Sequence, residues 1–179
     1  TKKIINQYSP NAPFSFNLLI PFNSETLEIA ESIQALLSQS GVNMNIQQLE
    51  WSAFKGRLTD GNFDAFILSW WADYPDGENF LYPLFHSSNI GSGGNYTGYN
   101  NETVDDLINR SQSIYKTDDR NELFHKIQLN IINDAPMFFL YQSKSYTVTQ
   151  AWVEGYSPHP LYNGNNMSDV AIVRKIKNS

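Results

Sequence analysis

The chain has no cysteine among its 179 residues, which excludes disulfides, thiolate metal sites and a cysteine nucleophile. Positive charge is also scarce, because 12 Lys and Arg stand against 18 Asp and Glu and leave a net charge of −6. An acidic surface repels phosphate backbones, so we expect no nucleic-acid binding. No run approaches the roughly 18 apolar residues of a membrane-spanning helix, and none is predicted.

Sequence motifs of catalysis and cofactor binding are missing as well. There is no Gly-x-Ser-x-Gly elbow and no phosphate-binding glycine loop before a helix. Asp73, Asp76 and Glu78 are close enough to suggest a glycosidase pair, but an acidic turn is the simpler interpretation. Three histidines lie far apart and have no partner at metal-ligand spacing: His86, His125 and His159. We therefore expect no enzyme, no cofactor and no metal site.

The pattern of residues 14–71 predicts an α/β fold. Residues 14–22 alternate as a strand, and residues 24–40 have helical spacing after a possible N-cap at Ser24. Residues 42–46 alternate again, and a phase slip before Leu49 suggests a bulge or a strand that leaves the sheet. Ser52 can cap a short helix, after which Phe63–Trp71 reads as a buried strand. Strand, helix, strand, helix and strand in succession predict a parallel sheet with right-handed crossovers.

The second half of the chain predicts helices and then an irregular tail. Residues 86–101 are rich in turn formers and predict a surface loop. Apolar stripes over residues 103–115 and 117–135 predict a helical hairpin that covers one face of the sheet, and Thr103 with Asp106 resembles a capping box. Met137–Tyr141 reads as another buried strand. From about Ala151 the periodicity is lost, and Asp169–Ile176 is the tract there that resembles a strand.

The stretch Asp64–Gly77 is the candidate binding edge. Its apolar run is followed by aromatic and acidic residues. In an open α/β sheet ligands bind beyond the carboxyl ends of the strands, which is where these residues are expected to lie. Trp51 follows the second strand and can wall the same crevice. Asp73 has no Lys or Arg beside it in sequence, so its carboxylate can bind a ligand ammonium. A solvated aspartate in a turn and tryptophans packed in the core remain the alternatives. Four more site residues are expected in this stretch: Trp70, Trp71, Asp73 and Tyr74.

Eight tracts occur in a characteristic order along the chain. The first four are Gly41–Ile46, Glu50–Phe54, Gly61–Asp64 and Trp70–Asp76. The other four are Asp105–Ile108, Arg120–Phe124, Asp134–Pro136 and Trp152–Tyr156. In this ordered combination the chain resembles the second lobe of the peptide/nickel-type extracellular solute-binding proteins of ABC importers. The resemblance implies a periplasmic-binding-protein-like lobe of type II, in which helices flank a mixed, mostly parallel sheet.

The resemblance also implies a function. Members of the family bind oligopeptides or dipeptides in a cleft between two lobes and deliver them to ABC transporter permease subunits in the membrane. Asp73 stands where peptide-binding members grip the peptide α-ammonium, and Trp51 and Trp70 stand where tryptophans line a side-chain pocket. Leu58 and Ile67 occupy positions at which some members hold the ligand carboxylate with arginine. The implied location is extracytoplasmic, in the periplasm or as a lipoprotein on the outer face of the cytoplasmic membrane.

Family members are longer, so the resemblance implies a C-terminal fragment. Residues 1–150 would be a partial second lobe, and residues 151–179 would form a tail that returns to the missing N-terminal lobe as its partner. Three other functions stay open. Relatives within the family bind oligosaccharides or nickel complexes, the same fold can serve as the ligand-sensing domain of a transcriptional regulator, and a glycosidase is the enzymatic alternative.

Overall fold

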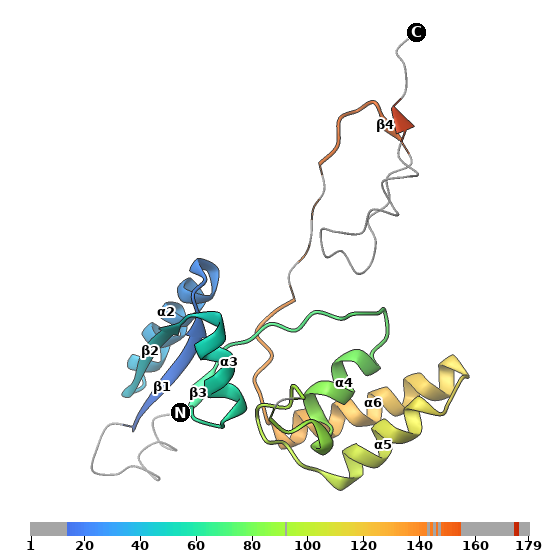
Figure 1. Ribbon diagram of the computed structural model, residues 1–179, viewed down its shortest axis with the longest axis horizontal. Helices are drawn as coiled ribbons and strands as arrows, with labels where there is room; N and C mark the ends of the chain where they lie inside the picture. The colour runs from blue at the N-terminus through green and yellow to red at the C-terminus, as the bar shows by residue number, and fades with distance from the viewer. Residues whose placement is uncertain are drawn as a thin grey trace. The chain divides into compact units, whose positions relative to one another are not determined.

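The computed structural model describes residues 14–91, 93–142, 144, 146, 148–154 and 174–175. These residues belong to two compact units (Figure 1). The first unit runs to Trp70 and also includes residues 86–100, whereas the second contains Trp71–Phe85 and the residues from Asn101 onward. Among the helices described, none has the length and apolar character needed to cross a bilayer.

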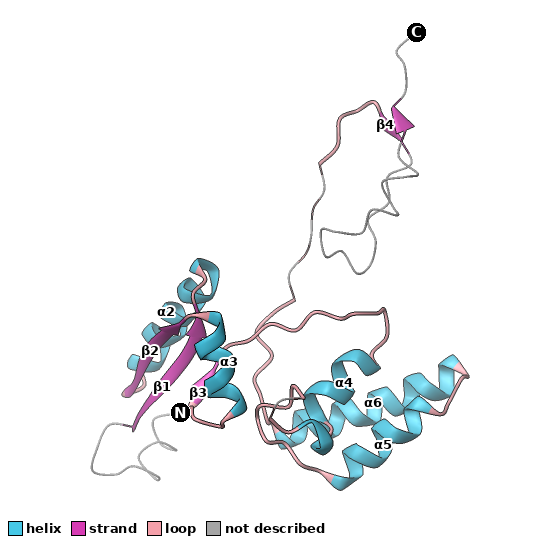
Figure 2. Ribbon diagram, in the orientation of Figure 1, coloured by secondary structure: helices cyan, strands magenta, loops and turns pink. Residues whose placement is uncertain are grey.

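The first unit is built on a parallel sheet (Figure 2). Strand β1 (Phe14–Pro21) lies between β2 (Val42–Leu49) and β3 (Ala65–Phe66) and is parallel to both. Helix α2 (Ser24–Ser38) connects β1 to β2, and helix α3 (Trp51–Thr59) connects β2 to β3. The predicted order of elements and the predicted parallel sheet are both confirmed.

The N-cap positions of the two helices in this unit lie before the predicted ones, by one residue in α2 and by two residues in α3. The Asn23 side chain accepts the backbone N–H of Thr26 at 2.8 Å, so Asn23 rather than Ser24 caps α2. Helix α3 begins at Trp51, and the preceding Glu50 makes no side-chain capping bond. The start of α3 is therefore set by the end of β2 and not by a polar cap.

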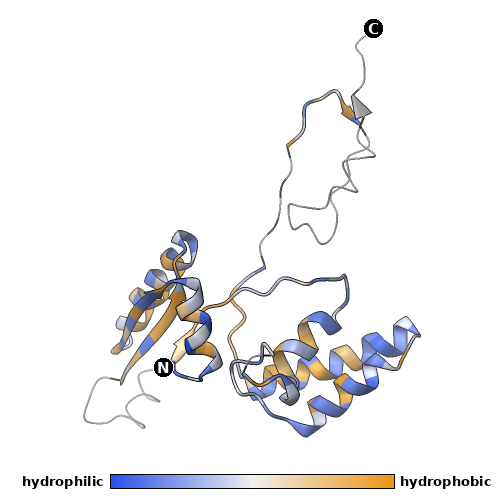
Figure 3. Ribbon diagram, viewed as in Figure 1, coloured by the Kyte–Doolittle hydropathy of each residue, from blue (hydrophilic) through white to orange (hydrophobic). Residues whose placement is uncertain are grey.

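Strand β1 is buried on both faces toward its carboxyl end. Leu18 and Ile20 pack with Ala30 of α2 and Met44 of β2 in one apolar cluster. Leu19, which points to the opposite face, joins a second cluster with three more buried residues: Phe54, Leu58 and Tyr96. Figure 3 shows this hydrophobic character along the strands. The sheet is thus covered by α2 on one face and by α3 and the loop of residues 86–100 on the other.

The predicted bulge in the second strand is wrong, and so is the alternative that this strand leaves the sheet. β1 and β2 pair in an unbroken register from Phe14 opposite Val42 to Pro21 opposite Leu49. Ile46 packs against the cluster of α2, whereas Leu49 packs against the cluster of α3. The change of phase in the sequence reflects a strand that is covered on both faces.

The third strand is shorter than predicted. Regular pairing covers Ala65–Phe66, and the N–H of Ile67 then donates to the carbonyl of Leu19 at 3.1 Å. The expected continuation to Trp71 is wrong. Apolar residues after Ile67 therefore lie in a connection rather than in the sheet.

The loop of residues 86–100 is more buried than its turn-rich sequence predicts. Asn95 is 1% exposed, and Tyr96 is buried in the second apolar cluster. The Asn95 side chain donates to the carbonyls of His86 and Tyr99 at 3.2 and 2.8 Å and accepts the N–H of Tyr99 at 3.1 Å. One amide side chain thus holds both arms of the loop, as the buried backbone requires.

The second unit contains helices α4 (Glu78–Phe85), α5 (Glu102–Gln112) and α6 (Thr117–Asp134). The predicted pairing of α5 and α6 as a hairpin is confirmed. Most residues of its apolar stripes are buried, but Tyr115, which lies beyond the end of α5, is 97% exposed. Asn101 caps α5 by accepting the N–H groups of Thr103 and Val104 at 2.9 and 3.3 Å. Helix α4, which contains Pro83, was not predicted from the sequence.

The prediction of a buried strand at Met137–Tyr141 is wrong. The segment has no strand pairing, and Phe138 is 85% exposed. Farther on, β4 (Val153–Glu154) pairs antiparallel with β5 (Arg174–Lys175). The rest of the strand predicted at Asp169–Ile176 lies outside the described residues.

Candidate functional site

An aromatic residue follows each of the three parallel strands of the first unit. Phe22 comes directly after β1, Trp51 is the second residue after β2, and Trp70 lies four residues after β3. The N–H of Phe22 donates to the carbonyl of Leu49 at 3.1 Å, so the chain leaves β1 and β2 at the same level. Phe22 is exposed and was not singled out from the sequence, although its place after Pro21 could have indicated it.

Trp51 is an exposed residue rather than a core residue. Its side chain is 55% exposed and stacks on buried Phe54, with ring centroids 5.9 Å apart and planes inclined at 29°. The Lys55 ammonium lies 5.8 Å from the centre of the Trp51 ring and 5.6 Å from that of Tyr96. Trp70, in the same unit, is half-buried. The alternative of simple core packing therefore does not describe Trp51.

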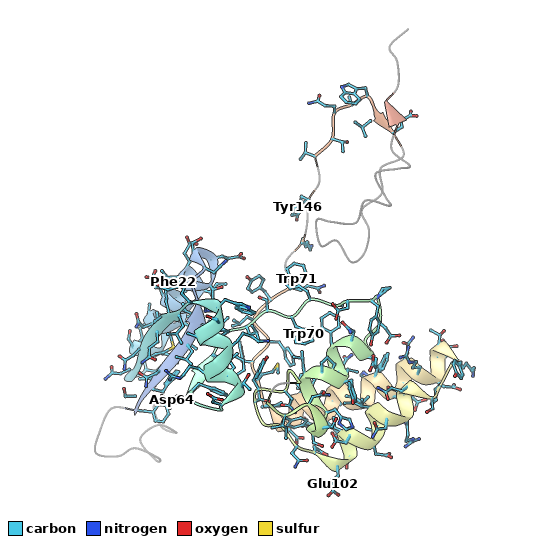
Figure 4. All side chains as sticks on the ribbon, in the orientation of Figure 1. Phe22, Asp64, Trp70, Trp71, Glu102 and Tyr146 are labelled. Carbon is cyan, nitrogen blue, oxygen red and sulfur yellow. The ribbon has the colours of Figure 1, made fainter. Side chains whose placement is uncertain are left out.

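The other three predicted site residues belong to the second unit. Trp71 is 69% exposed, and Asp73 and Tyr74 are exposed as well. The backbone N–H of Asp73 donates to Oδ1 of Asn79 in α4 at 2.7 Å. Figure 4 labels Trp70 and Trp71, the two neighbours between which one unit ends and the next begins. The structure thus divides the five predicted residues between two units.

Asp76 has an internal partner. Its carboxylate accepts bonds from the Arg120 guanidinium of α6 and, at 2.8 Å, from the N–H of Glu78. Burial raises the pKa of Asp76, but the bonds from Arg120 and Glu78 outweigh burial, so the pKa lies below its ordinary value. Asp76 is therefore a structural anion that fixes the turn before α4.

Glu78 is engaged in the same way. Its carboxylate accepts the Tyr74 hydroxyl and, at 2.8 Å, the side-chain amide of Gln112 in α5. The hydrogen bond to Glu78 raises the pKa of Tyr74. Both Asp76 and Glu78 therefore hold the turn together. Within the described part of the chain, no three acidic or histidine side chains gather as metal ligands.

Asp73 differs from its two acidic neighbours. Among the residues that the structure describes, its carboxylate takes part in no ion pair and no side-chain hydrogen bond. The ion pairs found there join other residues: Arg110 with Asp106, Lys116 with Asp119, Arg120 with Asp76, and Lys126 with Glu122. The turn is therefore held by Asp76 and Glu78, and the Asp73 carboxylate is left exposed.

The sequence matches a family model described as bacterial extracellular solute-binding proteins, family 5 middle, over residues 3–92. The oligopeptide-binding protein AppA of Bacillus subtilis is 33% identical over 84% of this chain and 28% of that protein. The dipeptide-binding protein of Escherichia coli is 30% identical over 79% of the chain and 26% of its own length. Heme-binding protein A of Haemophilus influenzae is 32% identical over 78% of the chain and 25% of its own length.

Solved structures give the same result for the fold. A dipeptide-binding protein from Pseudoalteromonas sp. SM9913 in complex with Met-Leu superposes with a TM-score of 0.78 at 26% identity, over 98% of this chain and 35% of that one. AppA of Bacillus subtilis in complex with a nonapeptide gives a TM-score of 0.76 at 25% identity, over 98% and 37%. The predicted periplasmic-binding-protein-like fold is confirmed. The chain, which spans little more than a quarter of the relatives it matches in sequence, belongs to the family 5 bacterial extracellular solute-binding proteins.

Proposed function

We propose that this chain contributes to the substrate-binding component of an ABC importer for oligopeptides or dipeptides. Membership of the solute-binding family and the peptide-binding relatives support this function. The protein would act outside the cytoplasm without catalysis and would present its ligand to permease subunits in the membrane. In this proposal residues 1–150 are part of the second lobe, and residues 151–179 return to the first.

Asp73 is the proposed contact for the peptide α-ammonium. The observation that carries this role is the contrast within one turn, where Asp76 is neutralised by Arg120 and Asp73 is exposed without an ion pair in the described chain. A charge-assisted hydrogen bond contributes about 1.5–3 kcal/mol, which corresponds to roughly a 10- to 150-fold change in affinity.

Aromatic side chains supply the remaining proposed contacts. Trp51, Trp71 and Tyr74 are exposed, and Trp70 is half-buried, so each offers ring surface to a ligand. Such surface binds peptide side chains without requiring one sequence, which suits a receptor of broad range. Leu58 and Ile67 pack in the two apolar clusters, so neither position offers a cation for the ligand carboxylate.

Titration calorimetry on the full-length gene product tests the role of Asp73. Free tripeptides and their N-acetylated forms are compared in the wild type and in Asp73→Asn. We expect the wild type to favour the free peptide by at least about tenfold and the variant to lose that preference. Asp118→Asn, at an exposed position of α6, is the matched control and should keep it. Equal wild-type affinity for free and acetylated peptides would refute the ammonium contact.

A haem ligand is the second candidate, because one relative is a haem-binding protein. The same exposed aromatic residues could stack on a porphyrin as well as on a peptide side chain. Haem and an oligosaccharide series are therefore titrated in parallel with the peptides. Tight binding of either, with no binding of any peptide, would replace the peptide assignment.

A further inference from the structure

Lys55 brings a positive charge to the sheet edge at which Trp51 lies. It stands four residues after Trp51 in α3, and long helical side chains lean toward the N-terminus of their helix. Its ammonium accordingly lies 5.8 Å from the centre of the Trp51 ring and 5.6 Å from that of Tyr96. The charge is thus held beside the exposed tryptophan rather than at the far end of the helix.

Both rings that flank the ammonium are supported by the core. Tyr96 is buried and meets Phe66 edge-on, with ring centroids 6.4 Å apart and planes at 87°. Trp51 rests on Phe54, which is fully buried. A cation near such rings is attracted to their electron-rich faces, so Lys55 has a preferred position despite its exposure.

The charge of Lys55 is not neutralised locally. The described part of the first unit has two cationic residues, Lys55 and Arg57. Arg57 turns to the other end of the helix and donates to the carbonyl of Asn62 at 2.6 Å. No carboxylate forms an ion pair with Lys55 among the residues described, and exposed Glu50 is not bonded to it. An uncompensated positive charge therefore lies next to the ring surface proposed to contact ligands.

We propose that Lys55 determines the charge specificity of the contact made by Trp51. A ligand side chain with a carboxylate gains a favourable partner there, whereas a lysine or arginine side chain meets a like charge. The receptor would thus take acidic and neutral peptides in preference to basic ones. This inference rests on the proposed peptide-binding function and adds a substrate class to it.

The test uses the full-length gene product and tripeptides in which Glu, Gln or Lys occupies one position and Ala the other two. In the wild type we expect affinity to fall from Glu through Gln to Lys at the position that contacts Trp51, by about fivefold overall at low salt. Salt should reduce the difference, because the charges are exposed. Lys55→Met should abolish this order of affinities with little change in affinity for the Gln peptide. Lys55→Arg keeps the positive charge and should show the same order as the wild type.

Arg57→Gln provides the matched control, because it removes an equal charge from the same helix and should preserve the order. Far-ultraviolet circular dichroism establishes that each variant is folded. Two results would overturn the inference while peptide binding stands: equal affinity for Glu and Lys peptides in the wild type, or an unchanged order in Lys55→Met. Absence of binding by every peptide, in a folded wild type, would instead refute the proposed function together with it.

Discussion

The carboxylate of Asp76 is bonded to the guanidinium of Arg120, 44 residues farther along the chain. Arg120 also donates through Nε to the carbonyl of Ser111 at 2.9 Å, and its guanidinium lies 4.9 Å from the centre of the Phe124 ring. One side chain therefore joins the turn before α4 to both helices of the hairpin. The stability of the second unit should depend on it.

Arg120→Met is expected to lower the free energy of unfolding by about 1–3 kcal/mol, because it leaves a partly buried carboxylate without its partner. The two side chains are 25% and 27% exposed. Arg110→Met is the matched control, since its 3.5 Å pair with Asp106 is well exposed and should contribute at most about 1 kcal/mol. Urea denaturation measures both, and equal losses would contradict the structural role of Arg120.

The lowered pKa of Asp76 predicts a dependence of stability on pH. The folded state binds the proton of this carboxyl less readily than the unfolded state does. The stabilisation is thus present above the ordinary pKa of about 4 and is lost as the pH falls below it. Urea midpoints at pH 7 and pH 3 should therefore differ less in Asp76→Asn than in the wild type. An equal difference would show that Asp76 contributes nothing to the acid transition.

Gly77 is close to the Phe124 ring. A Cβ at Gly77 would lie 3.2 Å from two carbons of that ring, which is tighter than ordinary contact. Gly77→Val should destabilise the protein by about 1–3 kcal/mol through overpacking. Gly56→Ala is the opposite case, because nothing beyond its chain neighbours and the nearby backbone of α3 itself lies within 4 Å of its Cβ position. It should stabilise the protein by about 0.5–1 kcal/mol. Thermal melts that rank the two variants otherwise would disprove this packing.

Asn95 should be the least replaceable polar residue of the loop formed by residues 86–100. Asn95→Ala removes a buried side chain that bonds both arms of the loop, so we expect a loss of about 2–4 kcal/mol. Asn100→Ala, at an exposed position, should change stability by no more than about 0.5 kcal/mol. Chemical denaturation of the two variants gives the comparison. A small effect of Asn95→Ala would mean that the loop does not depend on the hydrogen bonds of this side chain.

The pair formed by Tyr74 and Glu78 can be followed by titration. The hydrogen bond to Glu78 raises the pKa of Tyr74, so Glu78→Gln should lower that pKa toward its ordinary value. Carbon-13 NMR of labelled tyrosines measures the shift, and Tyr74→Phe identifies the resonance. A Tyr74 pKa that is unchanged in Glu78→Gln would rule out this bond in solution.

Local patterns predicted the first unit well. Alternation in residues 14–22 and 42–46, with a helical period between them, sufficed for the parallel sheet, because each element follows its own periodicity. The errors arose where an apolar residue is buried for a reason other than the regular alternation of a strand. Leu49 appeared out of phase because its strand is covered on both faces, and Phe63–Trp71 appeared to be one strand although pairing ends at Ile67.

Sequence patterns did not predict contacts between side chains that are far apart in the sequence. The acidic turn at Asp73–Glu78 was recognised, but nothing local indicates that Arg120 neutralises Asp76 and leaves Asp73 exposed. Lys55 was missed for the same reason, because Tyr96 is distant in sequence. Met137–Tyr141 shows the converse case, in which an apolar run predicts burial but the side chains from Phe138 onward are exposed.

Strand β1 has a consequence for how the first unit unfolds. Leu18 and Leu19 are chain neighbours, yet one packs with α2 and the other with α3. If either helix detached, it would expose β1, against which the other helix also packs. The two layers should therefore unfold in a single cooperative step. The backbone amides of β1 should therefore exchange with deuterium more slowly than any others in this unit.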